Sequence, residues 1–129
     1  MHVTVPNWVS VAFVALAKVF LWWAVPTAVE GRLPAGGCVL VSNHANYADG
    51  PLAMTLDWHR VRPVAKPNPD LIVKIGFALT RTIVTGREVL GRAIGHLRAG
   101  GVVWVAPEGR LNTGPALLPG HRSAARIAA

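Results

Sequence analysis

The chain has 129 residues, a length that fits one domain or part of one. It is 52% hydrophobic, only 15% of its residues are charged and its mean hydropathy is +0.39, which excludes a disordered chain and indicates a very buried sheet or contact with lipid. The formal net charge of +7 favours anionic partners, but the basic residues are scattered and the first 59 residues hold only Lys18 and Arg32, which disfavours nucleic acid.

The first predicted element is an apolar segment from Trp8 to Val25, interrupted by Lys18. At roughly 18 residues it is at the short edge of what a bilayer-crossing helix needs. Trp22 and Trp23 lie near one end, and aromatic residues favour the membrane interface. No basic stretch precedes the segment and no clear cleavage site follows it, which argues against a signal peptide. Three interpretations stay open: a helix lying in one leaflet, a helix crossing the bilayer, and a helix buried in the protein.

Short apolar runs then alternate with helical segments along the rest of the chain. The predicted strands are Cys38 to Ser42, Val61 to Ala65, Thr82 to Val84 and Val102 to Ala106. The predicted helices are Ala48 to Trp58, Pro69 to about Thr80, a segment from Thr85 to Gly100, and Arg122 to Ala129. This alternation predicts an α/β fold with a largely parallel sheet flanked by helices.

Polar residues at the helix starts predict how these helices are capped. Asp49 is a candidate N-cap, with Pro51 in the first turn, where a missing N–H is tolerated. Asn68 is the candidate cap of the next helix. Thr85 and Glu88 have the spacing of a capping box.

One cysteine and four histidines lie outside the polar segments that follow the strands. Cys38 is the only cysteine, so no intramolecular disulfide is possible, and we expect it to be a buried strand residue. The four histidines have no metal-ligand spacing and are expected at the surface: His2, His59, His96 and His121.

Two predicted strands end in polar sequences, and ligands bind beyond the carboxyl ends of strands in open α/β sheets. His44 follows the first strand, and Asp49 is close enough to accept a hydrogen from one ring nitrogen and leave the other as a base. Glu108, Gly109 and Arg110 follow the last strand, where the guanidinium is suited to phosphate and the glycine to a tight turn. The alternatives are a loop histidine beside a simple helix cap, and a solvated loop with a local ion pair.

Together the two segments resemble the signature of the phospholipid/glycerol acyltransferase family, which includes the 1-acylglycerol-3-phosphate acyltransferases. The family's N-H-x-x-x-x-D motif is matched by Asn43, His44 and Asp49. Its Pro-Glu-Gly motif, followed in some members by Arg, is matched by Pro107 to Arg110. The resemblance covers roughly Val29 to the end of the chain and implies the α/β fold of that family.

The resemblance also implies roles for these residues. His44 would be the general base on the acceptor hydroxyl, Asp49 its partner, and residues 108–110 part of the acceptor site near the glycerol and phosphate. Arg87, in the nearest match to the family's middle motif, is a further candidate for the acceptor phosphate, and Arg81 competes with it. No metal and no cofactor is implied. The co-substrate would be acyl-CoA or an acyl carrier protein thioester, and membrane lipid would be the other partner.

The organisation that the resemblance implies is a membrane-associated helix in residues 1–28 and an acyltransferase domain in residues 29–129, at the cytoplasmic face of the membrane. The family's last motif, a proline-containing strand, would follow Ala129, so we expect the domain to be incomplete at its C-terminus. Ala106 stands where phenylalanine is common, and Arg110 follows Gly109 without the usual threonine, which loosens the identity of the acceptor. The alternative functions are a catalytically inactive membrane-surface fragment that binds anionic lipid and, on charge alone, a nucleic-acid binder.

Overall fold

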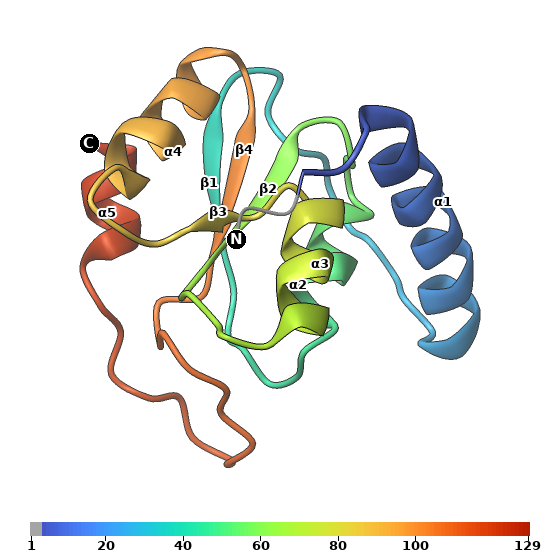
Figure 1. Cartoon of the computed structure of the whole chain (residues 1–129). Helices are drawn as coiled ribbons and strands as arrows, with labels where there is room; N and C mark the ends of the chain where they lie inside the picture. Colours follow the sequence, from blue (N-terminus) through green and yellow to red (C-terminus); the bar gives the residue numbers. More distant parts are fainter. Residues whose placement is uncertain (1–3) are drawn as a thin grey trace.

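The computed structural model describes residues 4–129 and shows a four-stranded sheet with helices on both faces (Figure 1). The strands are β1 (Cys38–Val41), β2 (Val61–Ala65), β3 (Ile83–Val84) and β4 (Val102–Val105). They pair in parallel in the spatial order β1-β4-β2-β3, so that β4 and β2 are central and β1 and β3 are edges. The α/β fold expected from the sequence is confirmed.

The helices divide between the two faces of the sheet. They are α1 (Asn7–Ala24), α2 (Asp49–Met54), α3 (Leu71–Leu79), α4 (Val89–Arg98) and α5 (Ser123–Ala128). α1, α2 and α3 lie on one side, whereas α4 and α5 cover the other (Figure 1). The fully buried strand β4 serves both sides, because Val102 and Trp104 point into the core under α2 while Val103 and Val105 point into the core under α4 and α5.

Met54 anchors the core on the α2 side, and its side chain is 0% exposed. We expect Met54→Ala to lower the free energy of unfolding by about 2–5 kcal/mol, because the substitution removes buried methylenes and leaves a cavity. Urea denaturation at constant pH measures this loss. The control is Leu117→Ala on an exposed loop leucine, which should stay within about 0.5 kcal/mol of the parent chain. Equal losses in the two variants would contradict the assigned core.

Helix α2 is shorter than predicted and is capped by another residue. It ends at Met54 rather than at Trp58, and the chain turns before β2. Ala48 occupies the N-cap position, so the prediction of Asp49 as the N-cap is wrong. The Asp49 side chain turns back toward the preceding loop, where it binds backbone N–H groups outside the helix.

The N-cap of α3 is Asp70 and not the predicted Asn68. One carboxylate oxygen of Asp70 accepts hydrogen bonds from the backbone N–H groups of Ile72 (2.7 Å) and Val73 (3.4 Å). The amide oxygen of Asn68 instead accepts from the backbone N–H of Asp70 (2.9 Å) and positions the cap. Asp70 is nearer than Asn68 to the first turn of α3, so Asp70 caps the helix.

Two expectations around α4 are also corrected. Glu88 is itself the N-cap and makes no side-chain capping hydrogen bond, so the predicted capping box with Thr85 is wrong. His96 is half-buried rather than on the surface, because its Nε2 donates to the carbonyl oxygen of Arg60 (2.6 Å). Burial lowers the pKa of this imidazole. His59 and His121 are exposed as expected, and His2 lies outside the described residues.

Cys38 is half-buried rather than fully buried. The reason is the place of β1 at an edge of the sheet described for residues 4–129, where β4 is its neighbour on one side. The same position leaves Val41 half exposed at the end of the strand.

The apolar helix α1 stands at one side of the molecule and is mostly exposed (Figure 1). Its buried residues are Ser10 and Val14, and Trp22 Nε1 attaches it to α2 by donating to Thr55 Oγ1 (2.9 Å). The interpretation of this segment as a helix buried in the protein is therefore wrong. By length and composition α1 could cross a membrane, and it is equally able to lie along one.

Candidate functional site

Both predicted site segments emerge at the same edge of the sheet. β1 and β4 are direct neighbours with Val41 beside Val105, so the residues that follow the two strands lie next to each other. The backbone N–H of Asn112 donates to the carbonyl oxygen of His44 (2.7 Å), which joins the two segments directly. The polar residues after β1 and after β4 therefore form one candidate site beyond the carboxyl ends of the strands.

The imidazole of His44 and the carboxylate of Asp49 meet across the short loop between β1 and α2. His44 Nδ1 lies 3.1 Å from Asp49 Oδ2, and because a carboxylate can only accept, Nδ1 carries the hydrogen and Nε2 of the neutral ring is free to take a proton. Asp49 Oδ2 also accepts the backbone N–H groups of Ala45 (2.7 Å) and Asn46 (2.8 Å). These bonds fix the carboxylate, which in turn fixes the ring. The alternative in which Asp49 serves only as a helix cap is wrong.

The His44 ring is supported from below by a buried indole. The His44 and Trp104 rings pack in a T-shaped arrangement, with 5.7 Å between ring centroids and an interplanar angle of 78°. Trp104 is itself held in place, because its Nε1 donates to Ser42 Oγ (3.0 Å). The His44 side chain keeps 22% of its surface exposed, so the ring can be reached from outside the protein.

Glu108 is buried and faces inward, with 6% of its surface exposed. Its Oε2 accepts hydrogen bonds from the backbone N–H of Leu118 (3.1 Å) and from Asn112 Nδ2 (2.8 Å), which pins the loop that follows β4. The Leu118 hydrogen bond holds the pKa of this carboxyl below its usual range; burial opposes that shift, and the Asn112 bond adds to it. The alternative of a solvated loop with a local ion pair is therefore wrong for Glu108.

The lowered pKa of Glu108 predicts an acid-sensitive fold. The pKa of Glu108 is lower in the folded state than in the unfolded state, where it is about 4.3 for glutamate, so the ionised carboxylate stabilises the fold. This stabilisation is fully present above the unfolded-state pKa. It is lost as the pH falls through the folded-state pKa. We expect the free energy of unfolding of Glu108→Gln to fall less steeply than that of the parent chain as the pH is lowered. Urea denaturation between pH 7 and 3 measures this acid limb of the stability profile. The control Glu88→Gln removes an exposed carboxylate and should leave that limb unchanged. An unaltered acid limb in Glu108→Gln would refute the assignment.

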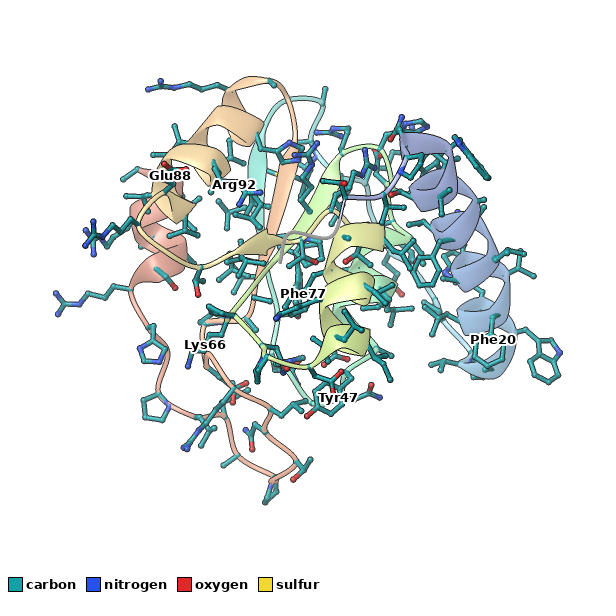
Figure 2. The ribbon with its side chains drawn as sticks, viewed as in Figure 1. Phe20, Tyr47, Lys66, Phe77, Glu88 and Arg92 are labelled. Carbon is teal, nitrogen blue, oxygen red and sulfur yellow. The ribbon has the colours of Figure 1, made fainter. Side chains whose placement is uncertain are left out.

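The turn after β4 brings two further polar side chains to the site. Gly109 has φ +64°, a left-handed conformation that favours glycine. A Cβ at this position would lie 2.9 Å from His121 Cδ2 and 3.7 Å from Lys66 Nζ, so both side chains approach the turn. Arg110 is exposed beside it. Lys66, at the same end of the sheet as Tyr47 (Figure 2), adds a positive charge to this edge.

The sequence contains a signal that marks Lys66 as a candidate site residue, but the sequence analysis did not identify it. It directly follows the predicted strand Val61 to Ala65, which is the signal that singled out His44 and Glu108. Asn112 carries no comparable signal, because its hydrogen bonds to His44 and to Glu108 depend on how the loop after β4 folds back.

The two arginines that competed for the middle motif lie at opposite ends of the edge strand β3. Arg87 follows the carboxyl end of β3 and is exposed. Arg81 precedes β3, and its Nη2 donates to the carbonyl oxygen of Trp58, before the start of β2 (2.8 Å). Arg87 is therefore the one on the site's side of the sheet, although β2 and β4 separate its strand from β1.

A cavity of about 370 Å³ adjoins the His44–Asp49 pair. The backbone segment that leads from α1 to β1 forms one wall of this cavity. Its polar lining residues are Thr27, Glu30, Ser42, Asn43, Asp49 and Thr55. The rest of the lining is apolar and consists of Ala28, Val29, Leu40, Leu52, Ala53, Leu56 and Trp104. This combination suits a molecule with an apolar tail and a polar reacting group.

Comparison with known proteins adds one match. A family model described as Acyltransferase matches residues 24–129, which includes both polar segments and the whole sheet. No curated protein and no solved structure matches the chain.

Proposed function

This chain belongs to the phospholipid/glycerol acyltransferase family and has an acyltransferase function, and from this premise we propose its reaction. It transfers a fatty acyl group from an acyl thioester, acyl-CoA or an acyl carrier protein thioester, to a hydroxyl of a lysophospholipid or glycerol phosphate. The observation that carries the proposal is the hydrogen bond between His44 Nδ1 and Asp49 Oδ2, 3.1 Å long, at the edge of the sheet where the loop after β4 meets the same histidine.

In the proposed mechanism His44 is the general base. Its Nε2 takes the proton of the acceptor hydroxyl as that oxygen attacks the thioester carbonyl carbon, and Asp49 stabilises the imidazolium that forms. A C–O bond forms and the C–S bond breaks. The departing thiolate takes the proton back from His44, so that the products are an ester and a free thiol. Binding and orientation supply the rest of the rate, because the carboxylate and the indole of Trp104 hold the ring in place.

The surroundings of the pair support an acceptor that carries phosphate. Lys66 and Arg110 supply positive charge beside the Gly109 turn, and Arg87 stands at the carboxyl end of β3. We propose that Glu108 contributes to the acceptor site indirectly, because its hydrogen bonds hold the loop after β4 in place. For the acyl chain we propose the cavity of about 370 Å³ beside Asp49, because its lining is mainly apolar.

The proposed place of the reaction is a membrane surface. The exposed side of α1 is mostly apolar, with Trp8, Leu16, Val19, Phe20 and Trp23 facing outward, and Lys18 is its one charged residue. Burying such side chains in lipid is favourable by about 25 cal/mol per Å² of apolar surface. The net charge of +7 favours the anionic cytoplasmic leaflet, so we propose a monotopic or peripheral association with that face.

Transfer of a labelled acyl group tests the proposal. The full chain is incubated with labelled acyl-CoA and lysophosphatidic acid in phosphatidylcholine vesicles, and the lipid product and the released thiol are measured together. Equal amounts of ester and thiol are expected. Vesicle binding without release of either product would overturn the proposed reaction and favour a membrane-surface module without catalysis.

A further inference from the structure

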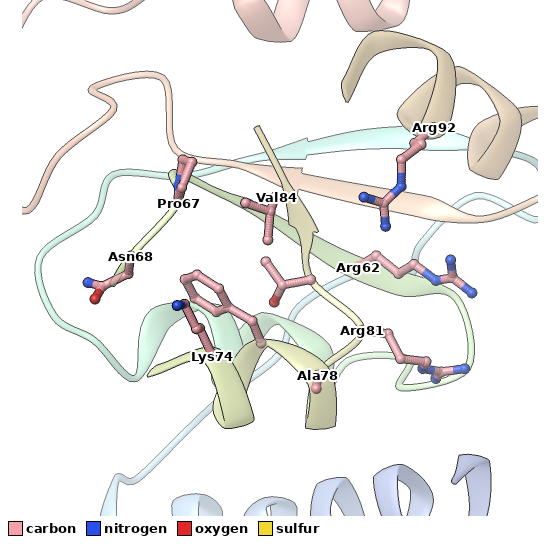
Figure 3. Close-up of a pocket in the computed structure, with 10 residues that line it drawn as sticks. Arg62, Pro67, Asn68, Lys74, Ala78, Arg81, Val84 and Arg92 are labelled. Carbon is pink, nitrogen blue, oxygen red and sulfur yellow. The ribbon is translucent and has the colours of Figure 1, made fainter. Parts of the chain in front are cut away.

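A second cavity, of about 430 Å³, lies at the opposite edge of the sheet from β1 and shares no residue with the candidate site. It opens beside the edge strand β3, between α3 on one face of the sheet and α4 on the other (Figure 3). Arg62, Arg81 and Arg92 gather at one end of it, and Asn68 and Lys74 stand at the other. Arg62 lies on β2, Arg81 in the turn between α3 and β3, and Arg92 on α4, so the fold and not a local sequence run assembles them.

The lining of this cavity carries positive charge without a compensating carboxylate. Four of the lining residues are cationic and none is aspartate or glutamate. Among residues 4–129 the ion pairs within 4.0 Å are His44 with Asp49 and Arg60 with Asp57, and neither involves the cavity. Like charges that are partly buried close together repel each other and lower the stability of the fold. An anion bound between them would remove this repulsion.

The guanidinium groups are also incompletely bonded. The Nε atoms of Arg62 and Arg81 are buried, and neither has a hydrogen-bond partner within the described part of the chain. Arg81 adopts φ +52°, a left-handed conformation that is uncommon for a residue with a side chain. Burial lowers the pKa of Arg62, and the nearby charges of Arg81 and Arg92 lower it further.

We infer that Arg62, Arg81 and Arg92 form a binding site for the phosphate group of a phosphate ester. A phosphate offers several oxygens to planar guanidinium donors, which suits a cluster of arginines better than a single carboxylate does. The cavity exceeds the size of a bare phosphate, and its wall between the two charged ends is formed by Phe77, Ala78 and Val84. The organic part of the ester lies on this wall. The inference goes beyond the proposed acyl transfer and does not depend on it.

The source of the phosphate is either a soluble ester or a lipid headgroup, and the chain can be tested for both. The soluble arm titrates inorganic phosphate and phenyl phosphate into the full chain by calorimetry. The vesicle arm compares sedimentation with phosphatidylcholine vesicles and with vesicles that also contain phosphatidic acid. The test variant is Arg92→Gln, which alters an exposed position on α4. The matched control is Arg98→Gln, which removes the same charge from the same helix outside the cavity.

We expect phenyl phosphate to bind more tightly than inorganic phosphate, and Arg92→Gln to weaken both by roughly ten- to a hundredfold. Arg98→Gln should change them less than about twofold. Because the substitution relieves repulsion, the ligand-free Arg92→Gln chain should melt no lower than the parent. Arg62→Gln is a second variant with the same expected loss.

The two arms name the source. A loss of phosphatidic acid-dependent sedimentation in Arg92→Gln, with no loss in Arg98→Gln, identifies a lipid headgroup. Weaker soluble binding with unchanged sedimentation identifies a soluble ester. Absence of phosphate binding in both arms overturns the inference, as does an equal loss in Arg92→Gln and Arg98→Gln, which would reduce the effect to surface charge.

Discussion

Replacing His44 by alanine should lower kcat of acyl transfer by about 10²- to 10⁴-fold, the contribution that a positioned general base makes. The substitution removes the imidazole that is hydrogen-bonded to the Asp49 carboxylate through Nδ1 and has its other ring nitrogen free to act as a base. The substitution leaves Lys66, which we propose for the acceptor phosphate, beside the Gly109 turn, so KM for the acceptor should change little. Steady-state rates of thiol release at saturating acyl-CoA and varied lysophosphatidic acid measure both constants.

The matched control for this experiment is His59→Ala. His59 is exposed and lies just before β2, at the opposite end of the sheet from the site, so its loss should leave kcat unchanged. The folded state of the His44 variant is checked by its unfolding free energy, which should fall by no more than about 1.5 kcal/mol for the lost contact with Trp104. A well-folded His44→Ala chain with the parent's kcat would remove the base from the mechanism.

Local sequence patterns predicted the elements of the fold, because each depends on its own residues. The apolar run Val102 to Ala106 was expected as a strand, and the structure has Val102–Val105 buried on both faces. The His44–Asp49 contact was also within reach, since a loop of four residues after a strand leaves few ways for the two side chains to be far apart. These predictions succeeded where the spacing along the chain itself fixes the geometry.

Predictions failed where the partners are distant in sequence or compete locally. The order β1-β4-β2-β3 joins strands that are distant in sequence, and no local pattern predicts that Lys66 approaches the Gly109 turn. Asp70 rather than Asn68 caps α3, because both residues can cap and the choice depends on where the backbone becomes helical. The Glu108 side chain turns inward because its Oε2 accepts a hydrogen bond from the backbone N–H of Leu118. Leu118 is ten residues away, in a loop without a regular sequence pattern.

The exposed side of α1 should decide whether the chain binds membranes at all. Replacing Phe20 and Trp23 together by serine removes two large exposed side chains from this side of the helix. Each is worth about 1.5–3 kcal/mol when it is buried in an apolar phase. The double variant should therefore partition into phosphatidylcholine vesicles roughly 10²- to 10⁴-fold less than the parent chain. Sedimentation of vesicles over a range of lipid concentrations measures the partition coefficient.

A matched leucine pair tests whether the effect belongs to α1. Leu16 on α1 and Leu117 in the loop after β4 are 72% and 76% exposed, so serine removes the same exposed group from two places. Leu16→Ser should weaken partitioning, whereas Leu117→Ser should not, and equal effects would mean that α1 is not the contact surface. A carbonate wash then separates the two remaining interpretations, since a helix lying in one leaflet is released and a spanning helix stays with the membrane. Release would place the His44–Asp49 pair beside the interface where an acceptor lipid presents its hydroxyl, because α1 is joined to α2, the helix that begins at Asp49.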